Sequence, residues 1–372
     1  MYIDQLRLKS FRNYDQCAIT LTPGINIFIG KNGQGKTNLL ESIYFMSTTK
    51  SHRNIEDVQL IKLNEEFSCI DCHTCYEDQK LWFSAVIHKK GKNLSIRNQS
   101  VKKVSEFIGK INAVLFSPTD MNLFDASPKY RRHFLDVELG KMSNVYINQL
   151  NTYNRLLKER NAYLKQDNVD RILFDAITEQ MILPQVSIIK KRQLFVDKLN
   201  GYITKFYQLM TESDDVIKIK YDSVVNYDID DEVIKHDLIS KYETTRDRDL
   251  LLRQTNIGIH REDIVFTIND FDVLAMASQG QKRMIIIALK LSLVAIIHEY
   301  TNEYPILLLD DVLSELDNHK KNRLIQILPK KVQTIITTTD PEDLLDSIVN
   351  QAVIYKIEKG SANQWMKNKS MI

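Results

Sequence analysis

The stretch Gly30-Lys31-Asn32-Gly33-Gln34-Gly35-Lys36-Thr37 decides the fold class of this chain, because it satisfies the pattern G-x-x-x-x-G-K-[ST]. It follows the apolar run Ile25 to Ile29, which predicts a strand, and it enters a segment with helical apolar spacing from Thr37 to Met46. Glycines let backbone N–H groups turn toward a polyphosphate, and the N-terminus of the following helix adds a favourable dipole. The sequence therefore predicts an α/β fold with a nucleotide-phosphate site at Gly30 to Thr37.

Two side chains at the end of this loop have the chemistry that ATP hydrolysis requires. The ammonium group of Lys36 would reach the β- and γ-phosphates and is a candidate catalytic group, while the hydroxyl of Thr37 would ligate Mg²⁺. An ordinary glycine-rich turn is the alternative interpretation. Glycine accounts for only 11 of 372 residues, and the loop lies between a strand and a helix, so the sequence favours the phosphate site.

A pair of acids further along the chain completes the expected metal site. Ile306 to Leu309 predicts a buried parallel strand, and Asp310 and Asp311 follow directly. Ligands of such sheets bind at the carboxyl ends of the strands. We expect Asp310 to hold Mg²⁺, directly or through water, and Asp311 to act as a general base on the attacking water. An aspartate in this position can also cap a helix, so the assignment depends on the phosphate loop.

The surrounding motifs indicate the class of nucleotide-binding protein. The chain has no N-K-x-D sequence for guanine, and leucine, not glycine, stands three residues after Asp310, which excludes a GTPase. Ser278-Gln279-Gly280-Gln281 resembles the L-S-G-G-Q signature of ABC-type ATPases. In that interpretation Ser278 and the N–H of Gly280 are directed at a γ-phosphate, with Gln281 in the same turn. In the alternative interpretation, Ser278 only caps a helix.

Two further segments agree in position with ABC-type ATPases. Ser314-Glu315-Leu316-Asp317 stands where these proteins carry their D-loop. Thr337-Thr338-Thr339 takes the place of their switch histidine, so the sequence does not identify the group that senses the γ-phosphate. The second acid lies about 270 residues beyond the loop, which is rare in small-molecule kinases and indicates a large insertion between the two halves of the site.

Composition and charge exclude several classes of protein. Apolar residues at 43% and charged residues at 26% are typical of a globular protein, and a net charge of +2 means that any nucleic-acid surface must be local. Met1 to Gln5 lacks the basic start and apolar run of an export signal, and the apolar stretch Met284 to Ile297 is interrupted by Lys290 and Ser292. With four cysteines, we expect a reduced, cytoplasmic protein that is neither secreted nor membrane-spanning.

The pattern of elements divides the chain into three parts. We expect residues 1–125 to form the N-terminal part of an ATPase lobe, residues 126–250 a mainly helical arm lobe, and residues 251–372 the C-terminal part of the ATPase lobe. Phe67 to Arg97 is expected to form strands, with turns near residues 77–79 and 89–93. The long helical stretch of the arm is expected to be interrupted at Pro184, which lacks a backbone donor.

A cysteine-rich segment gives a weaker signal. Cys69-Ile70-Asp71-Cys72-His73 has the spacing of a haem-attachment site, but such attachment belongs to exported proteins. On a strand, Cys69 and Cys75 would lie roughly 20 Å apart and cannot bind one metal ion. We interpret these cysteines as structural thiols of a sheet.

Taken in order, the motifs resemble the RecF family of bacterial recombination-repair ATPases, which is related to SMC heads. The resemblance rests on the phosphate loop, on Ser278 to Arg283 and on Leu307 to Asp317. It extends to further segments in the same order: Leu8 to Tyr14, Leu115 to Asp120, Ser127 to Asp136 and His260 to Asp263. The departures are Ile259, where the family usually has proline, and Gln279, in place of the first signature glycine.

The resemblance implies an ABC/SMC-like ATPase head with an inserted helical arm lobe. It implies that two copies sandwich two ATP molecules, each phosphate loop facing the signature helix of the partner. Binding of ATP would then close a homodimer on DNA, and slow hydrolysis would reopen it. Arg12 would lie near the nucleotide, and the alternative is a solvated charge at the end of a strand.

In cellular terms, the resemblance implies recombinational repair at gapped, single-stranded or junction DNA, loading of RecA together with RecO and RecR, and links to replication and the SOS response. DNA would be held mainly through its phosphates. Basic pairs such as Lys102-Lys103 and Arg131-Arg132 are expected to be solvated, and the sequence does not decide which of them contact DNA. The alternative function is an ABC-type ATPase subunit coupled to a protein or membrane partner without DNA.

Overall fold

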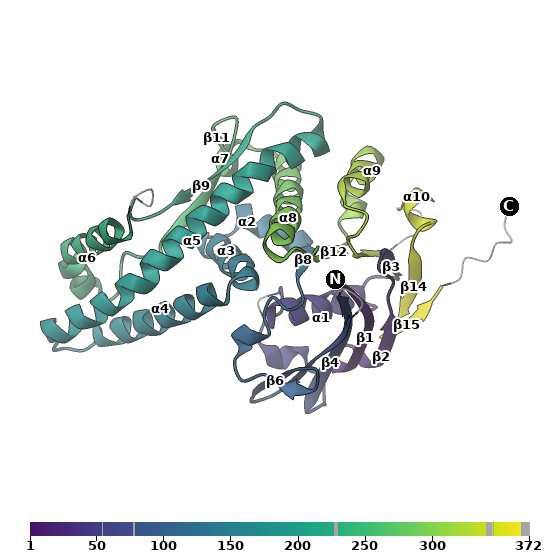
Figure 1. The fold of residues 1–372 in the computed structure, drawn as a ribbon, viewed down its shortest axis with the longest axis horizontal. Coiled ribbons are helices and arrows are strands. Elements are labelled where there is room, and N and C mark those ends of the chain that lie inside the picture. The colour runs from purple at the N-terminus through teal and green to yellow at the C-terminus, as the bar shows by residue number, and fades with distance from the viewer. Residues whose placement is uncertain (54, 77–78, 227–229, 340–343, 345, 366–372) are drawn as a thin grey trace. The chain divides into compact units, whose positions relative to one another are not determined.

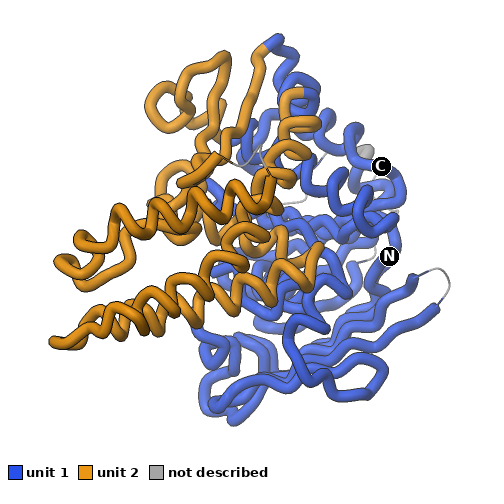
Figure 2. The backbone as a smooth tube through the Cα atoms, turned by 60° about the vertical axis from the view of Figure 1, so that its left-hand side comes forward, with its two compact units in different colours: residues 1–121, 205–214, 283–372 blue, residues 122–204, 215–282 orange. Residues whose placement is uncertain are grey.

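The computed structural model describes residues 1–53, 55–76, 79–226, 230–339, 344 and 346–365 (Figure 1). Contacts along the backbone divide the chain into two compact units, shown in blue and orange in Figure 2. Unit 1 comprises Met1–Met121, Lys205–Asp214 and Arg283–Ile372, and unit 2 comprises Asn122–Thr204 and Asp215–Lys282. Both ends of the chain therefore contribute to unit 1.

The sheet that carries the phosphate loop belongs to unit 1 and has the strand order β15-β14-β3-β13-β12-β8. Neighbouring strands run parallel except at the β14–β15 edge. The central strands are apolar and almost fully buried, as expected for parallel strands covered on both faces. The strands are β3 (Ile25–Ile29), β8 (Ala113–Phe116), β12 (Ile306–Asp310), β13 (Thr334–Thr338), β14 (Val353–Glu358) and β15 (Ser361–Gln364).

The second sheet of unit 1 is antiparallel, with the order β2-β1-β4-β5-β6-β7. Burial alternates along β1, β4 and β5, so one face of this sheet packs on the core and the other faces outward. A turn at residues 89–90 confirms one of the two expected turns, and residues 77–78 of the other lie outside the described residues. The strands are β1 (Tyr2–Phe11), β2 (Tyr14–Thr20), β4 (Phe67–Tyr76), β5 (Gln79–His88), β6 (Gly91–Ile96) and β7 (Gln99–Ser100).

Helix α1 (Lys36–Thr48) begins where the phosphate loop ends and packs against both sheets, on β4 of one and on β8, β12 and β13 of the other. Its side chains Leu39, Leu40, Ile43 and Phe45 are completely buried in the core of unit 1. Burial of one such side chain stabilises a fold by about 1.5–3 kcal/mol. Because the core holds α1 from two sides, the N-terminus of the helix has a fixed position at the edge of the parallel sheet.

Two helices, α5 (Arg171–Thr211) and α8 (Gln279–Thr301), are long and apolar enough to cross a membrane by length and composition alone. In α8, 72% of the apolar window is buried inside the structure, as in the core helix of a globular protein. Its buried Lys290 donates to the carbonyl of Leu115 at 2.7 Å and pairs with Asp120 at 2.8 Å. The remaining helices of unit 1 are α9 (Asn318–Ile327), α10 (Asp346–Val349) and the short turns η1 (Asp57–Leu60), η2 (Val104–Glu106), η3 (Pro118–Met121) and η4 (Leu313–Glu315).

Unit 2 is mainly helical and contains one small antiparallel sheet with the order β11-β10-β9. Helices α3 and α7 pack against β10 of this sheet. Most of α5 also belongs to this unit. Its other elements are α2 (Asn122–Asp125), α3 (Pro128–Met142), α4 (Asn144–Tyr163), β9 (Ile217–Asp222), α6 (Asp231–Leu252), β10 (Asp263–Ile268), β11 (Phe271–Asp272) and α7 (Val273–Met276).

Buried ion pairs hold the helices of unit 2 together. Arg160 of α4 has no exposed surface, and its guanidinium donates to Asp249 of α6 at 2.8 Å and to Thr255 at 2.7 Å. Arg192 of α5, which is 1% exposed, pairs with Asp136 of α3 at 2.8 Å. Loss of one partner of a buried pair costs about 3–5 kcal/mol, because the other charge is left uncompensated. These pairs therefore select the observed packing of α3, α4, α5 and α6.

The expected interruption of the helix at Pro184 is wrong, because α5 continues through this residue. Pro184 and its neighbours Ile182 and Gln185 are all buried in unit 2. Proline removes one backbone hydrogen bond from a helix. Tertiary packing on both sides of the proline outweighs that local loss, as it commonly does for helix propensity.

The two units of the structure and the three parts predicted from the sequence assign residues 205–214 and 251–282 differently. The strand β10 pairs with β9 over its whole length, from Asp263 opposite Asp222 to Ile268 opposite Ile217. This pairing groups residues 251–282 with the helices of unit 2, whereas the sequence pattern predicts them in the ATPase lobe. The end of α5, residues 205–214, groups instead with unit 1.

Candidate nucleotide site

The phosphate loop connects the end of β3 to the start of α1, as the sequence predicts. Gly33 has φ +77° and Gly35 has φ +116°, both in the region that favours glycine. A Cβ atom on Gly33 would meet nothing within 4 Å, so the backbone borders open space there. A Cβ atom on Gly30 would lie 2.4 Å from the carbonyl oxygen of Ile357 on β14. The glycines are thus required by backbone conformation and by close packing.

Two residues after β1 brace the loop from one side. The amide of Asn13 donates to the carbonyl of Gln34 at 3.0 Å, and the hydroxyl of Tyr14 donates to the carbonyl of Gly35 at 3.0 Å. A Cβ atom on Gly35 would lie 2.7 Å from both donors, so only glycine fits. Tyr14 is completely buried, which fixes the position of its hydroxyl.

The β14–β15 turn braces the loop from the other side. The backbone N–H of Lys359 donates to the side-chain oxygen of Gln34 at 2.7 Å, and the N–H of Gly360 donates to the Gln34 carbonyl at 3.3 Å. These contacts join residues more than 300 positions apart in the chain. The N-terminal and the C-terminal segments of unit 1 therefore both hold the loop in its conformation.

Lys36 is 7% exposed, and its Nζ donates to the carbonyls of Gly30 at 2.6 Å and Lys31 at 3.3 Å. Its ammonium group thus lies against the carbonyl groups of the first two residues of the loop. Burial lowers the pKa of Lys36, and the negative charges of Asp311 and Asp310 oppose this shift. The charge of the two acids therefore helps to keep this buried amine protonated.

Asp310 lies at the carboxyl end of β12, and two hydroxyl groups converge on its carboxylate. Thr37 and Thr337 each donate to Oδ1 of Asp310 at 2.9 Å. Asp310 is 6% exposed, and burial raises its pKa, while the hydrogen bonds from Thr337 and Thr37 oppose the rise. The predicted metal residues Thr37 and Asp310 are thus in direct contact across 273 positions of sequence.

Asp311 adopts a left-handed conformation with φ +56°, which is uncommon for a residue other than glycine. Its N–H donates to the hydroxyl of Thr337 at 2.9 Å, and its carbonyl accepts from the hydroxyl of Ser314 at 2.6 Å. Its carboxylate oxygen Oδ1 is buried without a hydrogen-bond partner among the described residues. A left-handed backbone at a residue other than glycine and a buried polar atom without a partner are both energetically unfavourable. Such features are therefore rare, and they are found mainly at functional sites.

The residues at this edge of the sheet fit a magnesium ion. Mg²⁺ is typically bound through carboxylate and hydroxyl oxygens together with phosphate oxygens and water. Asp310 and Thr37 supply such oxygens, and the partnerless oxygen of Asp311 lies on the next residue. A Cβ atom on Gly33 would meet nothing within 4 Å, so the backbone of the same loop borders open space. The chemistry of this donor set therefore fits a metal-bound polyphosphate.

The structure gives Arg12 partners within unit 1. Its guanidinium forms a two-point ion pair with Glu41 of α1, at 2.9 Å and 2.8 Å, and donates to the carbonyl of Gln59 at 3.1 Å. Glu41 is completely buried and also accepts from Ser51. Burial acts to raise the pKa of Glu41, but the hydrogen bonds from Arg12 and Ser51 lower it overall. The contact of Arg12 with a nucleotide stays a prediction.

The comparisons with known proteins identify the family. The family model described as RecF/RecN/SMC N terminal domain matches residues 2–363. A DNA replication and repair protein RecF from Listeria monocytogenes is 36% identical over 369 residues, which cover 98% of this chain and 100% of that protein. A protein of the same name from Halalkalibacterium halodurans is 38% identical over 367 residues, 97% of this chain and 99% of the relative. The chain belongs to the RecF family.

Solved structures agree with this membership. Two structures of the recombination mediator protein RecF of the RecFOR pathway, one with ATP and one named RecF-ATPrS, superpose with a TM-score of 0.90 at 30% identity, covering 98% of both chains. An SMC head bound to the C-terminal winged-helix domain of ScpA superposes with a TM-score of 0.55 at 13% identity, over 99% of each chain. The likeness to the SMC head concerns the fold alone. The predicted α/β class, an ABC/SMC-like head, is confirmed.

The signature residues lie in unit 2 of this RecF-family chain. The hydroxyl of Ser278 accepts from the N–H of Gln281 at 3.2 Å, while the side chain of Gln281 accepts from the N–H of Ser278 at 2.9 Å. This reciprocal arrangement is a capping box at the start of α8. Gly280 is exposed and would leave open space around a Cβ atom, apart from Ser278 Oγ at 3.9 Å. The cap confirms the helix start, and the contact with a γ-phosphate stays a prediction.

Four residues of the site were not assigned a role from the sequence. Asn13 and Tyr14 brace the loop, Glu41 holds Arg12, and Thr337 bridges the two acids. Asn13 and Tyr14 belong to a segment that resembles the RecF family, and Thr337 stands in place of the switch histidine, so all three carried a positional signal. Glu41 carried none, because a glutamate within a helix is usually exposed.

Proposed function

We propose that this chain is an ATP-dependent DNA-binding switch of recombinational repair, in which ATP drives dimerisation and hydrolysis reverses it. The observation that carries the proposal is the cluster formed by Lys36, Thr37, Asp310, Asp311 and Thr337 at one edge of the parallel sheet. A phosphate loop, a metal carboxylate and a second acid in contact are the parts that nucleotide hydrolysis needs. Membership of the RecF family supports the choice of DNA repair as the process.

Each residue of the cluster has a distinct task in this proposal. Lys36 would exchange the loop carbonyls for phosphate oxygens and neutralise their charge. Thr37 and Asp310 would hold Mg²⁺, which would neutralise negative charge on the phosphates when bound. Asp311 would accept a proton from the attacking water through its partnerless oxygen. Thr337 holds both acids in place through one hydroxyl group.

We further propose that hydrolysis is slow. Asp311 is one methylene shorter than the glutamate usual at this position in ABC-type ATPases, so the attacking water is held less well. The bend in the chain at Asp311, with φ +56°, fixes the direction of this short side chain. A slow step suits a switch, because the ATP-bound state then persists long enough to act. A steady-state rate like that of metabolic kinases would contradict this part of the proposal.

The proposed dimer rests on the resemblance of the signature segment to that of ABC-type ATPases. The phosphate loop lies in unit 1, and the signature residues Ser278, Gly280 and Gln281 lie in unit 2. We propose that two copies pair so that each signature helix meets the phosphates held by the other copy. The dimer would act at gapped or single-stranded DNA, together with RecO and RecR, and would help to load RecA. Links to replication and to the SOS response belong to the same proposal.

The decisive experiment is binding to a gapped DNA duplex in Mg²⁺ with ATP or ADP, for wild type and Lys36→Ala. Lys356→Ala is the matched control, because Lys356 is an exposed lysine of the same unit that pairs with Glu358. We expect tighter binding with ATP than with ADP in wild type and in the control, and no such difference in Lys36→Ala. Equal binding in all states would contradict the switch and favour an ABC-type subunit that acts on a protein or membrane partner.

A further inference from the structure

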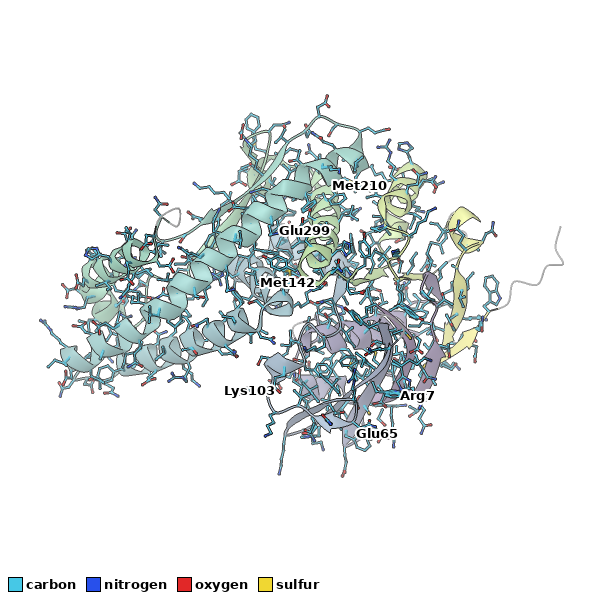
Figure 3. All side chains as sticks on the ribbon, in the orientation of Figure 1. Arg7, Glu65, Lys103, Met142, Met210 and Glu299 are labelled. Carbon is cyan, nitrogen blue, oxygen red and sulfur yellow. The ribbon has the colours of Figure 1, made fainter. Side chains whose placement is uncertain are left out.

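The outer face of the antiparallel sheet in unit 1 combines exposed aromatic rings with exposed cations. Phe67 of β4 is 37% exposed and Trp82 of β5 is 46% exposed. Arg7 and Lys9 of β1 are exposed, and Figure 3 labels Arg7 on this sheet. Arg97 follows β6, is exposed, and donates its backbone N–H to the carbonyl of Trp82 at 2.8 Å. We call these five residues the aromatic sheet face.

Strand register determines how these side chains are arranged. On β4, Phe67 lies opposite His88 of β5, and His73 lies opposite Trp82. On the other side of β4, Lys9 is opposite Cys69 and Arg7 is opposite Asp71. Directly opposed residues of neighbouring strands point to the same face. Phe67 and His73 are six residues apart on β4, so Phe67 and the His73–Trp82 pair are separated by roughly 20 Å. Arg7 and Lys9 of β1 lie next to the part of β4 between them.

Neighbouring groups hold both rings in place. The ammonium nitrogen of Lys9 lies 5.2 Å from the centre of the Phe67 ring, which is a cation–π distance. The imidazole of His73 meets the Trp82 indole edge to face, with ring centres 5.5 Å apart. Rings oriented in this way lose little conformational entropy when a ligand stacks on them.

The charge of this face is positive. Arg7, Lys9 and Arg97 supply three cations, and none of them forms an ion pair in the part of the chain that the structure describes. Between Phe67 and His73, β4 carries one carboxylate, that of Asp71, which lies opposite Arg7. The chain as a whole has a net charge of only +2, so this concentration of unpaired cations is a local feature.

We propose that the aromatic sheet face binds single-stranded DNA by stacking bases on Trp82 and Phe67 and by pairing phosphates with Arg7, Lys9 and Arg97. Every base offers a flat π face, so such stacking is tolerant of sequence, while basic side chains follow the backbone. Duplex DNA keeps its bases stacked on one another and cannot use the rings in this way. The inference rests on the proposed function in taking DNA as the ligand, and it adds the surface that recognises the single-stranded part of a gap.

The test uses the full-length chain and the fluorescence of Trp82. The chain has two tryptophans, Trp82 and Trp365, so Trp365→Phe leaves Trp82 as the only indole. Titration of this variant with an oligo(dT) strand in Mg²⁺-ATP should quench the fluorescence, and a blunt duplex should not. Trp82→Thr keeps a residue that favours strands and should weaken oligo(dT) binding about tenfold, the effect of losing one stacked base.

A second variant tests the charges independently of Trp82. Arg7→Gln combined with Lys9→Gln should weaken oligo(dT) binding and reduce the slope of log affinity against log salt by about 1.4, since each phosphate contact contributes roughly 0.7 on single strands. Lys158→Gln is the control, because Lys158 is an exposed lysine of α4 in unit 2. It should leave the slope unchanged.

The outcomes separate this inference from the proposed function. If Trp82→Thr and the double variant bind oligo(dT) like wild type, while wild type still binds gapped DNA more tightly with ATP, the sheet face is overturned and the switch is retained. Equal quenching by blunt duplex also overturns it. Quenching only by RecO or RecR, and not by DNA, would make the face a protein-docking surface and overturn the proposal. No DNA binding by wild type in any nucleotide state contradicts both.

Discussion

Replacing Thr337 by valine removes one hydroxyl group with almost no change in volume, and it should disturb both acids of the nucleotide site. The hydroxyl donates to the Asp310 carboxylate at 2.9 Å and accepts from the N–H of Asp311 at 2.9 Å. Thr337 is 1% exposed, so water cannot easily replace either bond. A hydrogen bond to a charged group contributes about 1.5–3 kcal/mol and one between neutral groups about 0.5–1.5 kcal/mol. Because Thr37 still donates to Asp310, we expect a loss of about 2–3 kcal/mol in the free energy of unfolding.

The loss should depend on pH. Burial raises the pKa of Asp310 above its ordinary value of 3.8, and the Thr337 hydrogen bond opposes that rise. An acid with a raised folded-state pKa destabilises the fold as pH rises from the unfolded value through the folded one. Without Thr337 the pKa of Asp310 rises further. The difference between Thr337→Val and wild type should therefore be smallest in acid and should grow toward neutral pH.

Urea unfolding of wild type and variant between about pH 4 and pH 8 measures this difference, and repeating it with Mg²⁺-ATP measures the added stabilisation by ligand. Thr334→Val is the matched control, because Thr334 is buried on the same strand and its hydroxyl donates to the carbonyl of Val332 at the long distance of 3.4 Å. The reasoning is refuted if Thr337→Val loses no more stability than Thr334→Val and keeps the full stabilisation by Mg²⁺-ATP.

Three further predictions concern the loop, α1 and the signature. Gly35→Ala should lower ATP affinity more than tenfold by calorimetry, since φ is +116° and the new Cβ would lie 2.7 Å from Tyr14 Oη; Gly201→Ala, with open space around it, should not. Glu41→Gln should lower the free energy of unfolding by about 2 kcal/mol at neutral pH, because it weakens hydrogen bonds to a charged group, and by less in acid. The pKa of Glu41 is lowered, so its contribution is present above the ordinary value of 4.5 and is lost as pH falls through the folded value; a constant difference across pH would contradict this. Ser278→Arg should keep ATP binding but abolish ATP-dependent dimers in light scattering, whereas Ser278→Ala, which removes only the cap, should still dimerise; dimers of Ser278→Arg would exclude the sandwich arrangement.

Much of the site could be predicted because its parts are contiguous in sequence. The phosphate loop, the strand before it and the helix after it occupy one stretch, and their order is confirmed by β3 and α1. The acids follow an apolar strand, and parallel pairing of β12 with β13 and of β13 with β3 brings them to the same edge as the loop. General rules for parallel sheets were enough to foresee that meeting.

Other features depend on contacts that no local pattern encodes. Thr337 bridges Asp310 and Asp311 only because β13 lies between β3 and β12. The turn at Lys359 and Gly360 reaches Gln34 from the far end of the chain, and burial of Glu41 depends on Arg12, 29 positions earlier. Pro184 shows the converse, since a strong local signal was overruled by packing on both sides.

The sequence by itself determined the phosphate loop, the pair of acids at the end of an apolar strand, the helix start at Ser278 and the family of this chain, because each depends on residue types at fixed short spacings. Tertiary structure alone decided which residues hold the site rigid and which face of the antiparallel sheet is left exposed with Trp82 and its cations. The physical reason is that hydrogen bonds and burial join residues hundreds of positions apart, and strand order and register, not local spacing, bring them within reach of one another.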